Sequence, residues 1–138
     1  MLALTHDQTL IWKGRTSFPG IAESVGAART WITARITGQG LEQPEDLPLV
    51  LSELAANAIS HTRSGTDGGQ FAVRALVYTD RIRVEVRDGG PFENTHPLHP
   101  ASPGLLDEHG RGLILVNALA SSWGRLATGR GVFAELLR

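Results

Sequence analysis

The stretch Leu49–Gly65, LVLSELAANAISHTRSG, decides the fold because it predicts a helix with an apolar side and a polar stripe. Glu53, Asn57 and His61 are each four residues apart, so they lie one above another on a helix. The apolar side consists of Leu51, Leu54, Ala55, Ala58 and Ile59. Polar groups beside a core stripe are costly unless they are paired or meet a ligand. A carboxylate one turn from an amide suits a magnesium–phosphate site with a base that activates a nucleophile.

The composition is that of an ordinary globular chain. Its 138 residues, 41% of them hydrophobic, suffice for one domain over residues 1–138 with a buried core. The net charge of −1 predicts no nucleic-acid partner, and no basic stripe is evident in the sequence. The absence of cysteine excludes disulfides and thiolate metal sites. No apolar run approaches the ~18 residues of a membrane span and no signal pattern begins the chain, so we expect a cytoplasmic protein without a membrane partner.

Hydrophobic periodicity predicts a strand and two helices in the first half of the chain. Partial alternation over residues 9–17 indicates a strand, and a helical period follows over residues 21–36. Gly38 and Gly40 end that helix. Pro44 stands where a first-turn proline belongs, so we expect the second helix to run from there to about Thr62.

The second half predicts four strands, one helix and one long loop. Residues 70–78 and 81–87 alternate around the turn Thr79-Asp80, and a hairpin over residues 123–128 and 132–137 ends the chain. A short helix over residues 113–120 precedes that hairpin. This order predicts an α+β two-layer sandwich, in which one mixed, mostly antiparallel sheet carries its helices on one face.

Residues 88–112 show no periodicity, and their prolines and glycines predict one long loop. Loops of this length in compact domains are often functional, so Pro91–His109 is interpreted as a lid over a ligand. His96 and His99 in this loop do not make a metal pair, because no third ligand accompanies them.

Three segments now occur in an order that resembles a known family. Glu53-x-x-x-Asn57 lies on a helix, Asp88-Gly89-Gly90 ends a strand, and Gly110-Arg111-Gly112-Leu113 opens a helix. Together they resemble the N, G1 and G2 boxes of the GHKL ATPases (gyrase, Hsp90, histidine kinase, MutL), which share the Bergerat ATP-binding fold. Within that superfamily, the chain is similar to the small anti-sigma-factor serine/threonine kinases and their actinobacterial relatives.

The resemblance implies a role for each residue of the polar stripe. Asn57 would hold the Mg²⁺ that bridges the phosphates of ATP, and its side-chain oxygen suits a hard cation. Glu53 would be the general base that acts at the γ-phosphate. His61 falls where relatives carry a polar residue near the phosphates, and a purely structural histidine is equally compatible with the sequence.

The other two boxes would hold the rest of the nucleotide. Asp88 would accept a hydrogen bond from the adenine amine, and Gly90 would allow close approach to the ring. The phosphates would lie at the start of the following helix, where exposed backbone N–H groups attract anions. The residues implied there are His109, Gly110, Arg111, Gly112 and Leu113.

The function implied is transfer of the γ-phosphoryl group from ATP to a serine or threonine of an anti-anti-sigma (STAS-type) protein. The implied partners extend to a sigma factor and to a second copy of the chain in a homodimer. The alternative is a catalytically silent, nucleotide-responsive module that sequesters a regulatory partner.

One position departs from the family pattern. Relatives commonly have glycine, a basic residue and then threonine in the last hairpin, whereas this chain has Gly129-Arg130-Gly131. The hydroxyl that would help to hold adenine is therefore missing, unless Thr128 supplies it.

Overall fold

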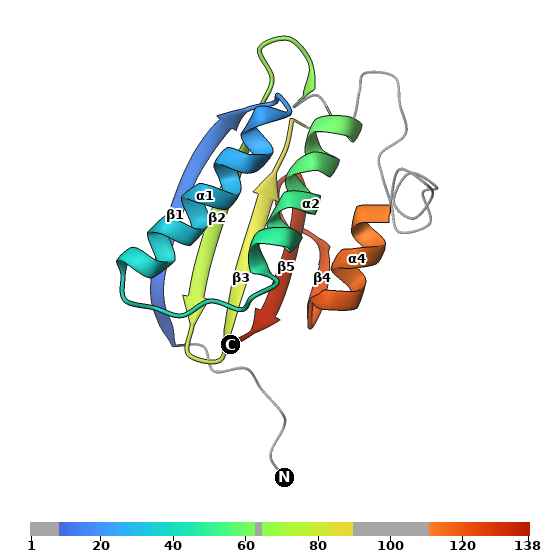
Figure 1. Ribbon diagram of the computed structural model, residues 1–138. Helices are drawn as coiled ribbons and strands as arrows, with labels where there is room; N and C mark the ends of the chain where they lie inside the picture. Colours follow the sequence, from blue (N-terminus) through green and yellow to red (C-terminus); the bar gives the residue numbers. More distant parts are fainter. Residues whose placement is uncertain (1–8, 63–64, 90–110) are drawn as a thin grey trace.

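A computed structural model describes residues 9–62, 65–89 and 111–138 as one open sheet covered on one face by helices (Figure 1). The strand order is β1-β2-β3-β5-β4, and each of the four pairings is antiparallel. The elements are β1 (Leu10–Pro19), α1 (Glu23–Gly38), α2 (Leu47–His61), β2 (Gln70–Tyr78), β3 (Arg81–Arg87), α4 (Arg111–Leu119), β4 (Ser122–Arg125) and β5 (Gly131–Leu137). The predicted two-layer α+β fold is confirmed.

The core lies between the helices and the face of the sheet that they cover. Alternate residues of a strand point to opposite faces, so one residue in two of β2 and β3 enters this layer. From these two strands the buried residues on that face are Phe71, Val73, Ala75, Val77, Ile82, Val84 and Val86. The helices meet them with Ile32, Ile36, Val50, Leu51, Leu54, Leu113 and Val116.

Short-range signals located most boundaries correctly. β2 and β3 have the predicted bounds, and Gly40, with a φ of 72°, follows the end of α1 with its N–H donating to the Thr37 carbonyl oxygen at 2.9 Å. α4 begins at Arg111, two residues earlier than predicted. β4 ends at Arg125 rather than at residue 128, because the Leu126 N–H donates to the Gly131 carbonyl oxygen across the turn (3.0 Å).

The predicted start of the second helix at Pro44 was wrong. α2 begins at Leu47, whose N–H donates to the Pro44 carbonyl oxygen at 3.1 Å, and Pro48 is the proline in its first turn. Both prolines satisfy the same local preference, since either lacks an N–H that a first turn leaves unpaired. In the helix that starts at Leu47, the side chain of this residue is buried in the core.

The face of the sheet away from the helices, here called the open face, is rich in cations. The residues of β2 and β3 that alternate with the core positions point to it, and so do those of β1 that alternate with Trp12 and Phe18. The cations placed there are Lys13, Arg15, Arg74, Arg81, Arg83 and Arg87. No basic stripe is evident in the sequence because these cations are dispersed along it and meet only when three strands pair.

None of the helices in the described part of the chain is long and apolar enough to cross a membrane.

Candidate nucleotide site

The middle helix, α2, lies between α1 and α4 on the sheet (Figure 1). Its contact with α1 includes a hydrogen bond from Arg29 Nη1 to Ser52 Oγ (3.0 Å), and Ser52 Oγ in turn donates to the Pro48 carbonyl oxygen (2.8 Å). Ser52 is only 7% exposed, so this bond lies partly within the protein. This bond shows that the flank of α2 that carries Ser52 faces α1.

The opposite flank of α2 carries the predicted polar stripe. Successive residues of a helix are about 100° apart, so Glu53 and Asn57 lie about 100° and 140° around the axis from Ser52, away from α1 and toward the side where Figure 1 places α4. Both side chains are half-buried. Neither makes a hydrogen bond or ion pair with another described residue, so nothing described competes with a ligand for them.

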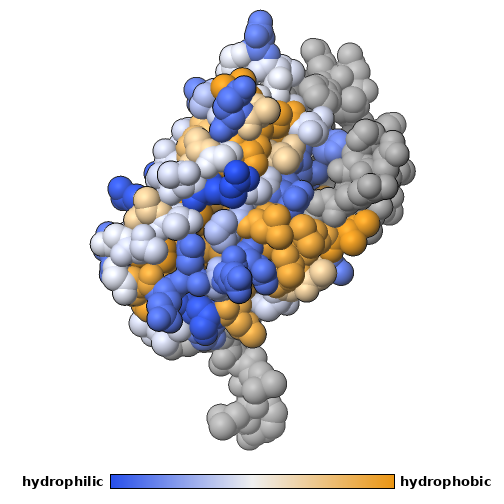
Figure 2. Space-filling view, in the orientation of Figure 1, coloured by the Kyte–Doolittle hydropathy of each residue, from blue (hydrophilic) through white to orange (hydrophobic). Residues whose placement is uncertain are grey.

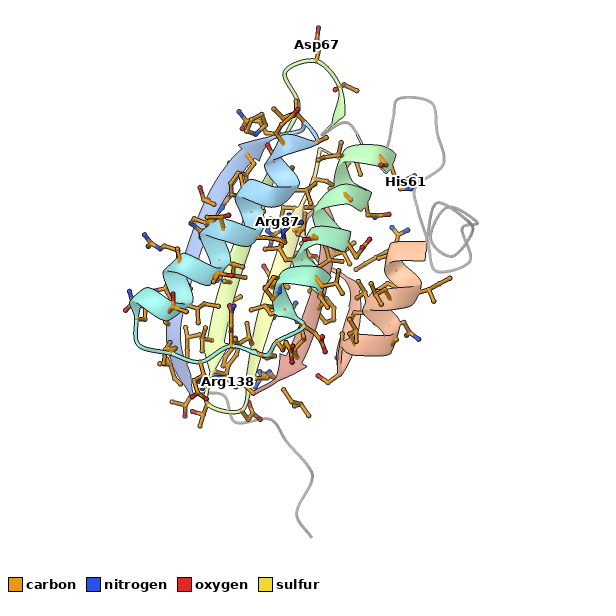
Figure 3. All side chains as sticks on the ribbon, in the orientation of Figure 1. His61, Asp67, Arg87 and Arg138 are labelled. Carbon is orange, nitrogen blue, oxygen red and sulfur yellow. The ribbon has the colours of Figure 1, made fainter. Side chains whose placement is uncertain are left out.

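His61 is the last residue of α2 and is half-buried. Figure 3 shows its side chain on the side of the helix away from α1. The stripe therefore extends over the last three turns of α2, as the spacing predicted.

Asp88 follows β3 directly, and its N–H continues the pairing toward the last hairpin by donating to the Arg130 carbonyl oxygen at 3.1 Å. Continued alternation from Val84 and Val86 places Asp88 on the helix-covered face. The half-buried carboxylate therefore lies at the end of the core layer, where a pocket floor was predicted.

Arg125 is a neighbour of this carboxylate that the sequence did not indicate. Partial burial lowers the pKa of Arg125, and the nearby Asp88 carboxylate acts in the opposite direction. Arg125 is opposite Val132 in the hairpin and thus shares the face of Asp88. Alternation along the hairpin is the signal that would have found it, had the register of β4 on β5 been known.

The start of α4 forms the third side of the site. Arg111 and Gly112 belong to the first turn of this helix, whose leading N–H groups have no partners within the helix. The Leu113 side chain is 1% exposed in the core, so only its backbone is available to a ligand. Gly90, His109 and Gly110, the remaining predicted site residues, lie outside the described residues, as do most of the predicted lid, His96 and His99.

The described residues contain no group of three or more histidine or acidic side chains that fits a metal ion. Mg²⁺ bound with a nucleotide does not require such a group, because that ion takes few protein ligands. Asn57 supplies an uncommitted oxygen for such an ion, and Glu53 lies one turn away.

The backbone explains the departure at Gly131. Its φ is 147°, and a Cβ there would overlap the Val86 carbonyl oxygen and approach Arg87 Cα to 2.8 Å. Threonine therefore does not fit this hairpin. The exposed Thr128 lies nearby, and its carbonyl oxygen accepts a hydrogen bond from Arg87 Nη1 at 3.0 Å.

The surface beside the site is apolar. Figure 2 shows hydrophobic residues gathered over α2 and α4, and the large apolar residues most exposed on these helices are Leu49 (41%) and Ile114 (51%).

Comparison with known proteins agrees with this geometry. The chain matches the family of histidine kinase-like ATPase domains over residues 18–132. That span includes all three boxes and every described element except the first part of β1 and the last part of β5. The chain therefore belongs to the histidine kinase-like ATPase domain family.

The similar curated proteins are serine kinases. The chain is 35% identical over 113 residues to the serine-protein kinase RsbW of Bacillus pumilus, covering 73% of this chain and 70% of that protein. It is 32% identical over 111 residues to the protein of the same name from Oceanobacillus iheyensis, with 73% and 70% covered. The RsbW of Bacillus licheniformis is likewise 32% identical over 111 residues, with 73% and 69% covered.

Proposed function

We propose that this protein is an ATP-dependent serine/threonine kinase of the anti-sigma-factor type, which phosphorylates an anti-anti-sigma (STAS-type) protein. The observation that carries the proposal is the pair Glu53 and Asn57, half-buried on the flank of α2 that faces α4 and unpaired among the described residues. Membership of an ATPase family and 35% identity to a serine kinase support the same activity.

ATP would span the space between β3 and α4. Asp88 would accept a hydrogen bond from the adenine amine, and the first N–H groups of α4 would hold the phosphates. Asn57 would hold Mg²⁺, which neutralises charge on the phosphates. His61, Gly90, His109, Gly110 and Arg111 complete the proposed nucleotide contacts.

The chemistry is a single phosphoryl transfer. The hydroxyl oxygen of the partner's serine or threonine forms a bond to the γ-phosphorus, the bond from that phosphorus to the β–γ bridging oxygen breaks, and ADP leaves with the electron pair. Glu53 accepts the hydroxyl proton. Its contribution is to orient and deprotonate the acceptor, so binding of ATP does not depend on it.

Glu53→Gln tests this role because the amide keeps the shape of the side chain and removes the base. We expect the variant to bind ATP with the affinity of the parent and to lose phosphoryl transfer to a STAS-type protein by ~10²-fold or more. Glu45→Gln, an exposed position before α2, is the matched control and should transfer at the parent rate. A Glu53→Gln variant that phosphorylates at the parent rate contradicts the assignment.

Asn57→Ala tests whether Asn57 holds the Mg²⁺ ion. We expect it to abolish the dependence of ATP affinity on Mg²⁺ in calorimetric titrations, while affinity measured without the metal is unchanged. If Mg²⁺ strengthens ATP binding equally in parent and variant, the metal is held elsewhere.

The same assays distinguish the kinase from the catalytically silent binding module. If the parent binds ATP yet leaves it intact for hours beside its STAS-type partner, the chain is a nucleotide-responsive binding module. Sequestration of a sigma factor and formation of a homodimer belong to the same proposal. Sedimentation velocity with and without each partner measures both.

A further inference from the structure

The open face of the sheet has an unbalanced charge. The described residues place six cations there, Lys13, Arg15, Arg74, Arg81, Arg83 and Arg87, against the two carboxylates Glu85 and Glu135, and Asp80 in the adjoining turn pairs with Arg81 at 2.9 Å. The whole chain has a net charge of −1, so this concentration of positive charge is local. Arg15 is directly opposite Arg74 in the ladder, which places like charges side by side.

The two carboxylates are already shared among arginines. Glu85 has Arg83 Nε at 2.9 Å and Arg74 Nη1 and Arg87 Nη2 at 3.7 Å. Glu135 has Arg83 Nη1 at 3.2 Å and Arg81 Nε at 3.5 Å. Both carboxylates are nearly buried, at 6% and 8% exposure, beneath these arginines.

The surplus charge lies on β1. Lys13 and Arg15 are exposed and form no hydrogen bond or ion pair with any other described residue. With Gly14, Arg74 and Arg87 they line a shallow depression of about 480 Å³ across β1, β2 and β3. Gly14 is opposite the core residue Ala75, so it contributes only backbone atoms to this depression.

We propose that this depression is the docking surface for an acidic segment of a protein partner. Carboxylates of such a segment would pair with Lys13, Arg15 and Arg74, which have no full counter-charge among the described residues. A second copy of this chain is a poor occupant, because face-to-face contact would bring the same cations together.

The surroundings favour a protein over a nucleic acid. Elsewhere on the open face, two arginines stack on aromatic rings, with Arg83 Cζ 3.9 Å from the centre of the Phe133 ring and Arg81 Cζ 4.0 Å from that of Tyr78. Mixed apolar and charged surface of this kind is typical of protein interfaces.

The proposal does not depend on the nucleotide site, which lies on the other face of the sheet. It is tested with the full chain labelled with ¹⁵N and titrated with short poly-L-glutamate as the acidic probe. We expect amide shifts confined to β1 and the adjoining parts of β2 and β3. Arg15→Glu should weaken binding by about tenfold, and added salt should weaken binding to the parent.

Arg35→Glu is the matched control, because it makes the same charge change at an exposed position on α1. It should alter probe affinity by less than about twofold, since it is on the helix side. Circular dichroism checks that both variants are folded.

Three outcomes would overturn the proposal. Shifts spread over both faces, or equal losses in the two variants, would show non-specific attraction. Tighter binding of an oligonucleotide of equal charge at the same residues would assign the face to nucleic acid. Self-association that Arg15→Glu abolishes would assign it to a second copy of the chain.

Discussion

β3 is covered on both faces, but by different kinds of side chain. Toward the helices, Ile82, Val84 and Val86 are at most 2% exposed among apolar neighbours. Toward the open face, Glu85 is only 6% exposed, yet it is covered by arginines rather than by a second layer of structure. Equal burial is therefore reached by hydrophobic packing on one face and by ion pairs and arginine stems on the other.

This difference separates stability from recognition. Apolar burial is not screened by salt, whereas ion pairs whose arginines are 23–39% exposed are. The helix-covered face holds the hydrophobic core and the proposed nucleotide site. The open face contributes less to stability and keeps charge available for a partner.

The largest effect is expected where a charge enters the apolar face. Val84→Asp buries an unpaired carboxylate at a fully buried position and should cost at least about 4 kcal/mol in unfolding free energy. Urea denaturation measures the loss. Leu137→Asp, at a residue 61% exposed, is the control and should stay within about 0.5 kcal/mol of the parent.

A smaller but still large effect is expected at the junction of β3 with the last hairpin. Gly131→Thr introduces the residue common in relatives, and the clash with Val86 together with a φ of 147° should cost about 3 kcal/mol. Thermal melts of the variants and the parent measure this cost. Gly38→Ala is the control, because a Cβ there meets nothing within 4 Å, and it should be neutral or slightly stabilising. A Gly131→Thr variant as stable as the parent would mean that the hairpin adapts.

On the open face, Glu85→Ala leaves three arginines facing one another and should cost about 2 kcal/mol, less than a fully buried pair because the arginines are partly solvated. Added salt should stabilise this variant by screening the arginines, and it should weaken the parent. Urea midpoints at low and high salt measure both trends. Identical salt responses would show that the carboxylate does not organise the face.

The smallest effect is expected for Arg74→Met, which keeps the aliphatic stem and removes a charge that is 39% exposed and 3.7 Å from Glu85. We expect a change below about 0.5 kcal/mol. A double-mutant cycle with Glu85→Ala isolates the pair. A coupling energy above about 1.5 kcal/mol would show that Arg74 and Glu85 interact as strongly as a buried ion pair, and the two faces of the sheet would then differ less in their contribution to stability.

Local patterns were sufficient for much of this fold. Because only a two-residue turn joins β2 and β3, their alternation is enough to locate where each strand begins and ends. The four-residue spacing of Glu53, Asn57 and His61 is enough to place the three residues on one flank of α2. Long-range pairing was not accessible in this way. The approach of Arg15 to Arg74 depends on the register of β1 with β2, and that of Arg125 to Asp88 on the hairpin register.

Backbone conformation explains what patterns alone left open. From the sequence, Gly131 indicated only that a hydroxyl is missing. The reason for the glycine lies in its φ and in the nearby Val86 carbonyl oxygen, which are properties of the folded hairpin. The start of α2 was misjudged for a related reason, since Pro44 and Pro48 fit a first turn equally well. The buried position of Leu47 distinguishes the two starts only once the core is known.

The place of β5 in the strand order has a consequence for folding during synthesis. This strand is the last of the sheet in sequence, yet it lies between β3 and β4 rather than at an edge. A chain still emerging from the ribosome can form the hairpin of β2 and β3, but it cannot complete the sheet until residues through Leu137 are available. Until then β3 presents an unpaired edge, so shortening the chain before Gly131 should yield an aggregation-prone product rather than a smaller domain.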